Sequence, residues 1–253
     1  MDKPMAATSR DARRLADEAE RRNLVLTVFH NRRWDGDFLT VRRLRDEGRL
    51  GDVARFESRF DRWRPEVAAG RWRELADPAD AGGLLFDLGS HLVDQAIELF
   101  GPPASVYAEV TARRPGAAVD DDVFVALEHP GVRAHRWASV VAGEPGPRFR
   151  VLGLEAAYVK AGLDPQEAAL REGARPGDAD WGRDARDGRL VAGERCETVE
   201  TERGAYESFY AGLVSSLRED VAPPVSPGDA VRVVEVLEAA RRSAAEACVV
   251  VVL

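Results

Sequence analysis

The sequence is poor in cysteine: only Cys196 and Cys248 occur in 253 residues, and no Cys-x-x-Cys pair is present. This scarcity excludes the dense disulfide framework of small secreted domains and favours a reducing compartment. Long hydrophobic runs are also lacking. The longest, residues 249–253, is far too short to cross a bilayer, and the N-terminus has no apolar signal-peptide core. We therefore expect a soluble, cytoplasmic protein with no membrane partner.

An excess of basic residues is missing as well. Lys and Arg number 36 against 44 Asp and Glu, which gives a formal net charge of −8 at pH 7. Proteins that bind nucleic acids normally present a net basic surface to the phosphates. The arginine pairs at 13–14, 32–33, 42–43 and 241–242 are interleaved with acids at helical spacing, as on solvated helix faces. The charge balance therefore predicts no nucleic-acid partner.

What the chain does contain is enough apolar sequence, 45% of its residues, for one large domain or two modest ones. Thr8 and Asp11 form a capping box before a helix predicted over 10–23. Residues 173–194, rich in Gly, Arg and Asp, predict an exposed loop. The other predicted helices cover residues 37–47, 84–100, 164–172, 204–219 and 227–246, the last with Pro227 in its first turn.

The predicted strands are of two kinds. Residues 24–29, LVLTVF, are apolar at almost every position, as in a parallel strand buried on both faces. Several of the others alternate polar and apolar residues, which favours an antiparallel sheet with one covered face. They are residues 54–63, 105–112, 121–128, 132–141 and 148–154. Because 24–29 has no parallel neighbour in the chain, and a single αβ unit cannot bury both faces of its strand, a domain is missing on this interpretation.

The stretch GGLLFDLGSHLVD, residues 82–94, carries the most suggestive polar residues. On one helix, Asp87 at i−4 and Asp94 at i+3 would lie near His91. A carboxylate beside an imidazole fixes its tautomer and suits an acid/base that works near neutral pH. The alternatives are a solvated or capping pair and, for Asp94, a packing role. No metal site is expected, because two ligands without a dedicated third fall short of the usual count.

Four segments follow one another in a recognisable order. They are DKPMA with an amphipathic helix after it, VFHNRRWDGDFL, RWRELADPADAGGLLFDLGSHLVD, and YESFYAGLVSSLRED with PVSPGDAVRVVEVLEAARRSA after it. Together they resemble the Gfo/Idh/MocA family of NAD(P)-dependent sugar, inositol and related oxidoreductases. The resemblance extends from Asp2 to about Ala245.

The resemblance implies an α+β fold, a large and mostly antiparallel sheet with helices on one face, preceded by a remnant αβ unit of a Rossmann domain. Residues 1–30 would then be the end of a dinucleotide-binding domain, and residues 31–253 the C-terminal substrate and oligomerisation domain. Family members commonly associate through the open face of this sheet. A homodimer or homotetramer that uses strands between about 104 and 160 is therefore expected.

The resemblance also assigns roles to individual residues. Lys3 matches the lysine of the family's Glu-Lys-Pro motif, here Asp2-Lys3-Pro4, and Asp87 and His91 match its Asp-x-x-x-His helix. In such enzymes a hydride passes between the nicotinamide and a substrate carbinol carbon while lysine and histidine move the hydroxyl proton. Lys3, Asp87 and His91 are thus the expected catalytic residues, and Lys3 and Pro4 the expected cofactor contacts. A neutral His91 can accept the proton, and Lys3 can stabilise the developing charge on oxygen.

Candidates for the substrate pocket lie in segments where the family places substrate contacts. They are Asn31, Arg32, Trp63, Trp72, Arg73 and Tyr206. For the two tryptophans the alternative is a core or rim position, and for Arg73 it is a structural ion pair. The implied substrate is a sugar, an inositol or a related polyol, and these residues do not identify a single compound.

The family's cofactor fingerprint has no counterpart in this sequence. A Gly-x-Gly-x-x-Gly turn between a strand and a helix, with an acid about twenty residues later, is absent. We therefore expect NAD or NADP to bind this chain alone weakly or not at all. Three interpretations stay open: a dehydrogenase fragment left by a mis-set start or truncation, a natural short form that works with a partner or as an assembly subunit, and an acid/base enzyme for proton transfer or elimination.

Overall fold

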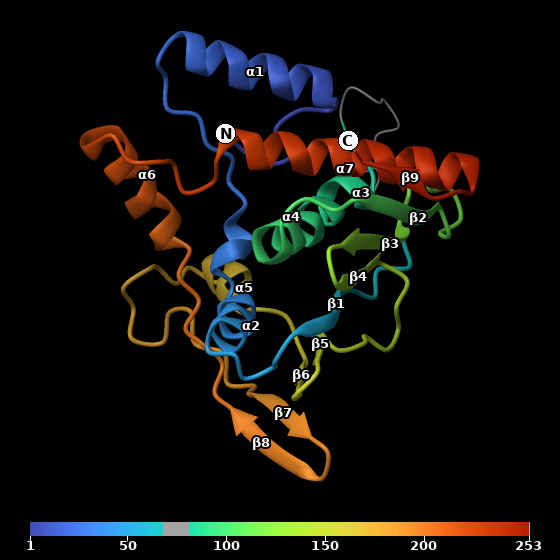
Figure 1. The fold of residues 1–253 in the computed structure, drawn as a ribbon, viewed down its shortest axis with the longest axis vertical. Coiled ribbons are helices and arrows are strands. Elements are labelled where there is room, and N and C mark those ends of the chain that lie inside the picture. Colours follow the sequence, from blue (N-terminus) through green and yellow to red (C-terminus); the bar gives the residue numbers. More distant parts are fainter. Residues whose placement is uncertain (68–80, 253) are drawn as a thin grey trace.

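The centre of the structure, a computed structural model that describes residues 1–67 and 81–252, is a nine-stranded sheet (Figure 1). The strands lie in the order β8-β7-β6-β5-β1-β4-β3-β2-β9, and β1 with β4 is the parallel pair among otherwise antiparallel neighbours. Their bounds are β1 (Val53–Asp61), β2 (Ser105–Thr111), β3 (Asp122–His129), β4 (Val132–Ser139), β5 (Phe149–Gly153), β6 (Ala157–Lys160), β7 (Gly188–Ala192), β8 (Arg195–Val199) and β9 (Val250–Val251).

Helices cover one face of the β1–β4 part of this sheet. Figure 1 shows α4 and α7 stacked over it, with α1 on the outer side of α7. The helices are α1 (Ser9–Arg21), the 3-10 helix η1 (Asn31–Trp34), α2 (Gly36–Asp46), α3 (Leu84–Asp87), α4 (Gly89–Phe100), α5 (Gln166–Arg171), α6 (Glu207–Glu219) and α7 (Pro227–Glu246). None of the helices in the described part of the chain has the length and apolar character needed to cross a membrane.

Alternation along the strands places the core on the helix-covered side. In β3, Val123, Val125 and Leu127 are buried, whereas Phe124 and the other residues between them are only half-buried. Side chains of a strand point to opposite faces in turn, so Val123, Val125 and Leu127 face the helices and Phe124 faces the other side. The alternation read from the sequence is confirmed, and with it the α+β fold with a large, mostly antiparallel sheet.

Local signals in the sequence account for where two of the helices begin. The Thr8 hydroxyl oxygen accepts a hydrogen bond from the Asp11 backbone N–H at 3.1 Å, and the hydroxyl donates to the Asp11 carboxylate at 2.8 Å. Ser226 accepts from the Asp229 N–H at 3.0 Å, with Pro227 as the first residue of α7. Both caps satisfy N–H groups that have no partner inside the helix. The capping box and the position of Pro227 are confirmed.

The helix expected over 84–100 is instead two helices, α3 and α4, that meet at Leu88. At this junction the backbone carbonyl of Asp87 accepts hydrogen bonds from the Lys3 ammonium at 2.5 Å and from the Ser90 hydroxyl at 3.0 Å. Side chains that bind a helical carbonyl compete with the regular backbone ladder. Asp87 and His91 therefore lie on two consecutive helices, and not on one continuous helical face as the spacing predicted.

Residues 24–29 form no strand of the sheet, contrary to the prediction. Leu24 and Val25 are 61% and 42% exposed. Backbone hydrogen bonds join the segment to the first residue, from the Met1 amino group to the Thr27 carbonyl and from the Phe29 N–H to the Met1 carbonyl. A strand needs a ladder partner of several residues, and a single residue does not provide one. Thr27 and Val28 are nevertheless buried.

The far end of the sheet also differs from the sequence prediction. The loop predicted over 173–194 contains β7, and β6 and β8 beside it were not predicted. β8 is exposed at four of its five positions, so its sequence carries no alternating apolar signal. Such short edge strands form because a neighbouring strand offers a hydrogen-bonding edge, which a local pattern does not reveal.

His129, at the end of β3, makes the stability of the fold depend on pH. It is 1% exposed and lies against Phe100, with ring centroids 5.7 Å apart. Burial, reinforced by Arg136, lowers the pKa of its imidazole from 6.5 to about 4. Between these values the unfolded chain binds more protons than the folded one, so the free energy of unfolding falls as the pH is lowered from 6.5 to 4.

We expect His129→Phe to make this fall shallower, since phenylalanine does not titrate. Urea denaturation at several pH values across the window measures the slope. Tyr107→Phe, which changes no group that titrates there, is the control and should keep the wild-type slope. A His129→Phe protein with an unaltered slope would contradict the assignment.

Candidate functional site

A cavity of about 1330 Å³ opens where the N-terminal segment meets the end of β1, the α3–α4 junction, α5 and the start of α6. Six of the residues singled out from the sequence line it: Lys3, Asn31, Arg32, Asp87, His91 and Tyr206. They come from segments up to two hundred positions apart in the chain. The fold thus gathers the predicted catalytic residues and half of the predicted pocket residues around one space.

Three predicted pocket residues are not among those that line the cavity. Trp63 is 62% exposed and lies outside the lining. Its extended neighbours Arg62 and Arg64 face the cavity, so alternation turns Trp63 away from it. Trp72 and Arg73 lie outside the described residues. Pro4 is half-buried behind Lys3, and the bond between the two residues is cis.

Lys3 and Asp87 form an ion pair on the cavity wall. The Lys3 ammonium lies 2.6 Å from the Asp87 carboxylate and also donates to its backbone carbonyl at 2.5 Å. Both side chains are mostly buried, with 9% and 14% exposed. An ion pair with additional hydrogen bonds in a poorly solvated position is held in one geometry. The pair therefore fixes the N-terminal segment against the α3–α4 junction.

His91 lines the cavity beside this pair. Its Nδ1 atom is buried and has no hydrogen-bond partner among the described residues. The expected orientation of His91 by the Asp87 carboxylate is thus not formed, since that carboxylate accepts from Lys3 instead. Burial, and after it the positive charges of Lys3 and Arg32, hold the pKa of His91 well below 6.5. The imidazole is neutral at pH 7 and can accept a proton.

Arg32 and Tyr206 form a second polar group on the wall. The Arg32 guanidinium donates to the Tyr206 hydroxyl oxygen at 2.9 Å, and that hydroxyl donates to the Asp35 carboxylate at 2.7 Å. Burial raises the pKa of Tyr206, and the Asp35 charge raises it further, so the phenol keeps its proton. Because both side chains bind the buried Asp35, Arg32 and Tyr206 keep a fixed position at the cavity.

Asp94 has the packing role that was one of its two alternatives. It is fully buried and accepts three hydrogen bonds from Arg33 at 2.7–3.1 Å. Arg33 also pairs with Glu98 at 2.7 Å. Asp94 is not among the cavity-lining residues.

The cavity has further polar and aromatic walls that sequence reasoning missed. Trp181 is 2% exposed, and its indole N–H donates to Glu207 at 2.7 Å. The remaining aromatic and arginine linings come from Phe29, Tyr210, Arg62, Arg64, Arg114 and Arg171. The alternation of Arg62, Trp63 and Arg64 was the one signal available for part of this set, because it places both arginines on the face opposite the tryptophan.

The described residues provide no cradle for a dinucleotide pyrophosphate. Such a cradle is a glycine-rich turn between a parallel strand and the N-terminus of its helix. Here the parallel pair is β1–β4, and the chain leaves β1 toward the cavity without entering a glycine-rich turn. In the same part of the chain no cluster of His, Cys, Asp or Glu could hold a metal ion. The described residues therefore suit proton chemistry, with an ammonium and a neutral imidazole, and do not fit a whole dinucleotide.

Comparison with known proteins agrees with this geometry. Residues 42–252 match the family model described as "Oxidoreductase family, C-terminal alpha/beta domain" of the Gfo/Idh/MocA proteins. Scyllo-inositol 2-dehydrogenase (NADP(+)) IolW of Bacillus subtilis is 38% identical over 97% of this chain and 70% of its own length. The oxidoreductase YdgJ of Escherichia coli is 44% identical over 96% of this chain and 71% of its own.

A solved structure shows the same fold over the whole chain. The oxidoreductase yvaA from Bacillus subtilis superposes with a TM-score of 0.94 at 36% identity, covering 100% of this chain and 73% of that one. This chain thus spans about seven tenths of the length of these relatives. With the family model matched over most of its residues, the chain belongs to the Gfo/Idh/MocA family of oxidoreductases.

Proposed function

We propose that the cavity binds a sugar, an inositol or a related polyol and that its residues move the hydroxyl proton during oxidation of a carbinol carbon to a carbonyl. The observation that carries the proposal is the meeting of Lys3, Asp87 and His91 on one wall. The name of the Bacillus subtilis relative, an inositol dehydrogenase, supports the substrate class. The aromatic wall also suits a ring with apolar faces and a hydroxyl rim.

The proton steps follow from the geometry of the site. As the carbinol C–H bond gives up a hydride, its hydroxyl must lose a proton in step, and neutral His91 accepts it. The Lys3 ammonium, held by Asp87, stabilises the negative charge that develops on the same oxygen. In the reverse direction His91 returns the proton. Asp87 acts through Lys3 and is a positioning residue.

NAD or NADP is the oxidant that this proposal requires, as the NADP(+) in the relative's name suggests. Most affinity for a dinucleotide comes from the pyrophosphate on a helix N-terminus and from the acid on the ribose. Of the two expected cofactor contacts, Lys3 lines the cavity and Pro4 does not. We therefore propose that this chain alone binds the cofactor weakly.

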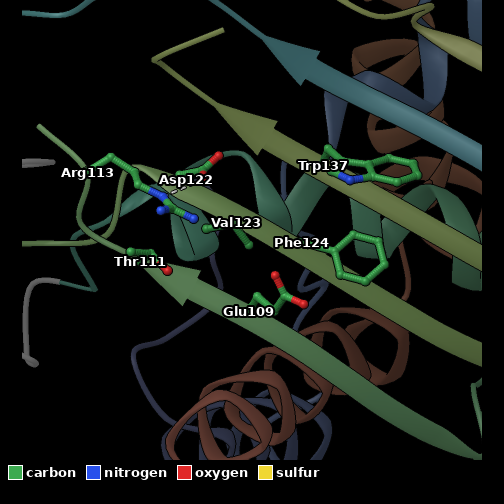
Figure 2. A pocket seen from close by; sticks show the side chains of 7 residues that line it. All are labelled: Glu109, Thr111, Arg113, Asp122, Val123, Phe124 and Trp137. Carbon is green, nitrogen blue, oxygen red and sulfur yellow. Dashed lines mark hydrogen bonds and ion pairs between the residues drawn. The ribbon is translucent and has the colours of Figure 1, made fainter. Parts of the chain in front are cut away.

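The face of the sheet opposite the helices carries a row of aromatic side chains. Figure 2 shows Phe124 of β3 beside Trp137 of β4, with Glu109 of β2 and the Arg113–Asp122 ion pair on the same side of the sheet. These residues line a hollow of about 390 Å³. Tyr107 and His135 extend this aromatic row, at 6.5 and 5.8 Å from the Phe124 ring.

A second copy of the chain is the occupant that we propose for this face. Both signs of charge are interspersed with its aromatic rings, for example in the Arg59–Glu57 pair beside Trp137. Such a mixture suits a two-fold contact in which each patch meets its own equivalent. A homodimer, or a homotetramer built from it, is therefore part of the proposal.

The first prediction from this proposal concerns His91. With millimolar NAD or NADP, which supports turnover even when binding is weak, His91→Ala should lower polyol oxidation by about 10² or more. Calorimetry should show polyol affinity little changed. Because its pKa lies below 6.5, wild-type oxidation should persist as the pH falls to 6.5 and decline only below that value.

Asp87→Asn should also impair oxidation, since the amide lacks the charge that holds Lys3. Arg10→Gln, at an exposed position of α1 outside the cavity lining, is the control and should behave as wild type. Turnover of His91→Ala within about twofold of wild type would mean that the residue is structural. A wild-type protein that neither binds nor oxidises any polyol would contradict the proposed function.

A second prediction concerns the cofactor. Titration of the purified chain with NADH and NADPH, by calorimetry or fluorescence, should show no micromolar binding, because contacts at the nicotinamide end fall short of the roughly 8 kcal/mol required. Micromolar binding would refute this expectation. No binding, together with redox-neutral turnover of a sugar-like compound, would favour proton transfer or elimination over oxidation.

A third prediction concerns assembly. Sedimentation at tens of micromolar should give a dimer or tetramer, and Trp137→Glu should shift it toward the monomer by placing a charge in an apolar contact. Leu217→Glu, at an exposed apolar position of α6 far from this face, is the control and should leave the assembly intact. A wild-type monomer at these concentrations would overturn the proposal for this surface.

A further inference from the structure

One end of the cavity gathers more arginine than its carboxylate can neutralise. The Glu167 carboxylate is contacted by both Arg32 and Arg171 and lies 3.9 Å from Arg62. Arg32 has an additional partner in the buried Asp35. One glutamate is thus shared by three guanidinium groups, only one of which has a second carboxylate.

Arg64 adds a further positive charge to this end. It lines the cavity and has no ion-pair partner among the described residues. Its closeness to Arg62 is evident from the electrostatics, because burial and then the Arg64 charge lower the pKa of Arg62. Arg62 shares Glu167 with two other arginines, and like charges kept close together with so little compensation are unfavourable, so an anion bound here would be stabilised.

The backbone holds Arg62 and Arg64 in place. Their N–H groups donate to the carbonyls of Ser139 and Val140 at 2.8 and 2.7 Å, and the Arg62 carbonyl accepts from Ala142 at 3.1 Å. Residues two apart in an extended segment point to the same side. Both guanidinium groups therefore project from a fixed edge into the cavity.

Four other carboxylates of the cavity already have partners of their own. Asp87 pairs with Lys3, Asp120 accepts from the Leu85 N–H, Asp121 pairs with Arg114, and Glu207 accepts from Trp181. None of these groups forms an ion pair with Arg62 or Arg64 among the described residues. Glu66, two residues beyond Arg64, also lines the cavity but forms no ion pair with either arginine among the described residues. An anionic ligand can therefore supply further negative charge at this end.

We propose that Arg62 and Arg64 form a subsite for an anionic group, a carboxylate or a phosphate, carried by the sugar or polyol substrate. The inference rests on the proposed function and narrows its substrate class from neutral polyols to acidic or phosphorylated ones. Guanidinium groups are planar donors that match the oxygens of either anion in pairs. Arg62 also lies within electrostatic reach of Asp87, so the anionic group would be bound close to the Lys3–Asp87 pair.

Matched ligands test the subsite without any cofactor. Calorimetry would compare D-glucose with D-glucuronate and D-glucose 6-phosphate, and inorganic phosphate would be titrated alone. For the wild type we expect at least one charged sugar to bind about tenfold or more tightly than glucose, as one or two charge-assisted hydrogen bonds provide. The preference should weaken as salt is added.

Variants of Arg62 and Arg64 test whether these two arginines cause the preference for charged over neutral sugars. In the double variant Arg62→Gln/Arg64→Gln the affinity ratio of charged to neutral sugar should drop to within about threefold. The single variant Arg64→Gln, at an exposed position, should lower the ratio part of the way and guards against misfolding of the double variant. Arg10→Gln, at an exposed position of α1 outside the cavity lining, should keep the wild-type ratio.

Each outcome decides between the proposals. A preference for glucuronate identifies a carboxylate, and a preference for glucose 6-phosphate identifies a phosphate. Equal binding of charged and neutral sugars, or a preference that survives in both variants, overturns the subsite and leaves the proposed function standing. If inorganic phosphate binds but none of the sugars does, both the subsite and the proposed function are contradicted. The same holds if no compound binds.

Discussion

The ion pair between Lys3 and Asp87 is the interaction on which the site depends. It joins two residues 84 positions apart and draws the N-terminal segment onto the junction between α3 and α4. The same ammonium binds the Asp87 carbonyl where the helix is interrupted, and its charge helps to keep His91 neutral. Loss of this pair would release the N-terminal wall of the cavity and change the protonation of its base together. Structure and acid/base behaviour are coupled here through one contact.

Buried polar groups behind the cavity extend this dependence. Asp35, fully buried, accepts from Tyr206 and pairs with Arg32, and Arg148 lies 4.0 Å from its carboxylate. Burial raises the pKa of Asp35, and the neighbouring arginine charges oppose that rise. Interior charges of this kind add little net stability, but removal of one partner leaves the other without compensation. The network therefore holds the wall residues in one arrangement.

The sequence was sufficient to predict elements whose formation depends on a local pattern of residues. The alternation of Val123, Val125 and Leu127 predicted β3, and the Thr8–Asp11 capping box and Pro227 indicated the starts of α1 and α7. It was not sufficient for features that depend on a contact with a residue distant in the sequence. The break at Leu88 accompanies a bond from Lys3, and β8 exists because β7 offers it an edge.

The candidate site was predictable to a similar extent. The family resemblance led to Lys3, Asp87 and His91, and the structure brings all three to one cavity. The hydrogen bond expected from His91 to Asp87 is absent because Lys3 competes for the carboxylate, a contact between segments that no helical spacing expresses. Only Arg32 of the cationic end was predicted. Arg62, just after β1, and Arg171, at the end of α5, were missed because the sequence separates these segments widely.

The extended stretch Arg62–Trp63–Arg64 has a consequence for how the chain can vary in length. Backbone hydrogen bonds to Ser139 and Val140 fix its register, so that guanidinium groups face the cavity and the indole faces away. Deletion of one residue just before this stretch would exchange the two sides, burying the indole among charges and turning both arginines outward. A substitution here alters one side chain, whereas a one-residue insertion or deletion exchanges the side chains on the cavity side with those on the outer side. We therefore expect this part of the chain to be more sensitive to a change in length by one residue than by two.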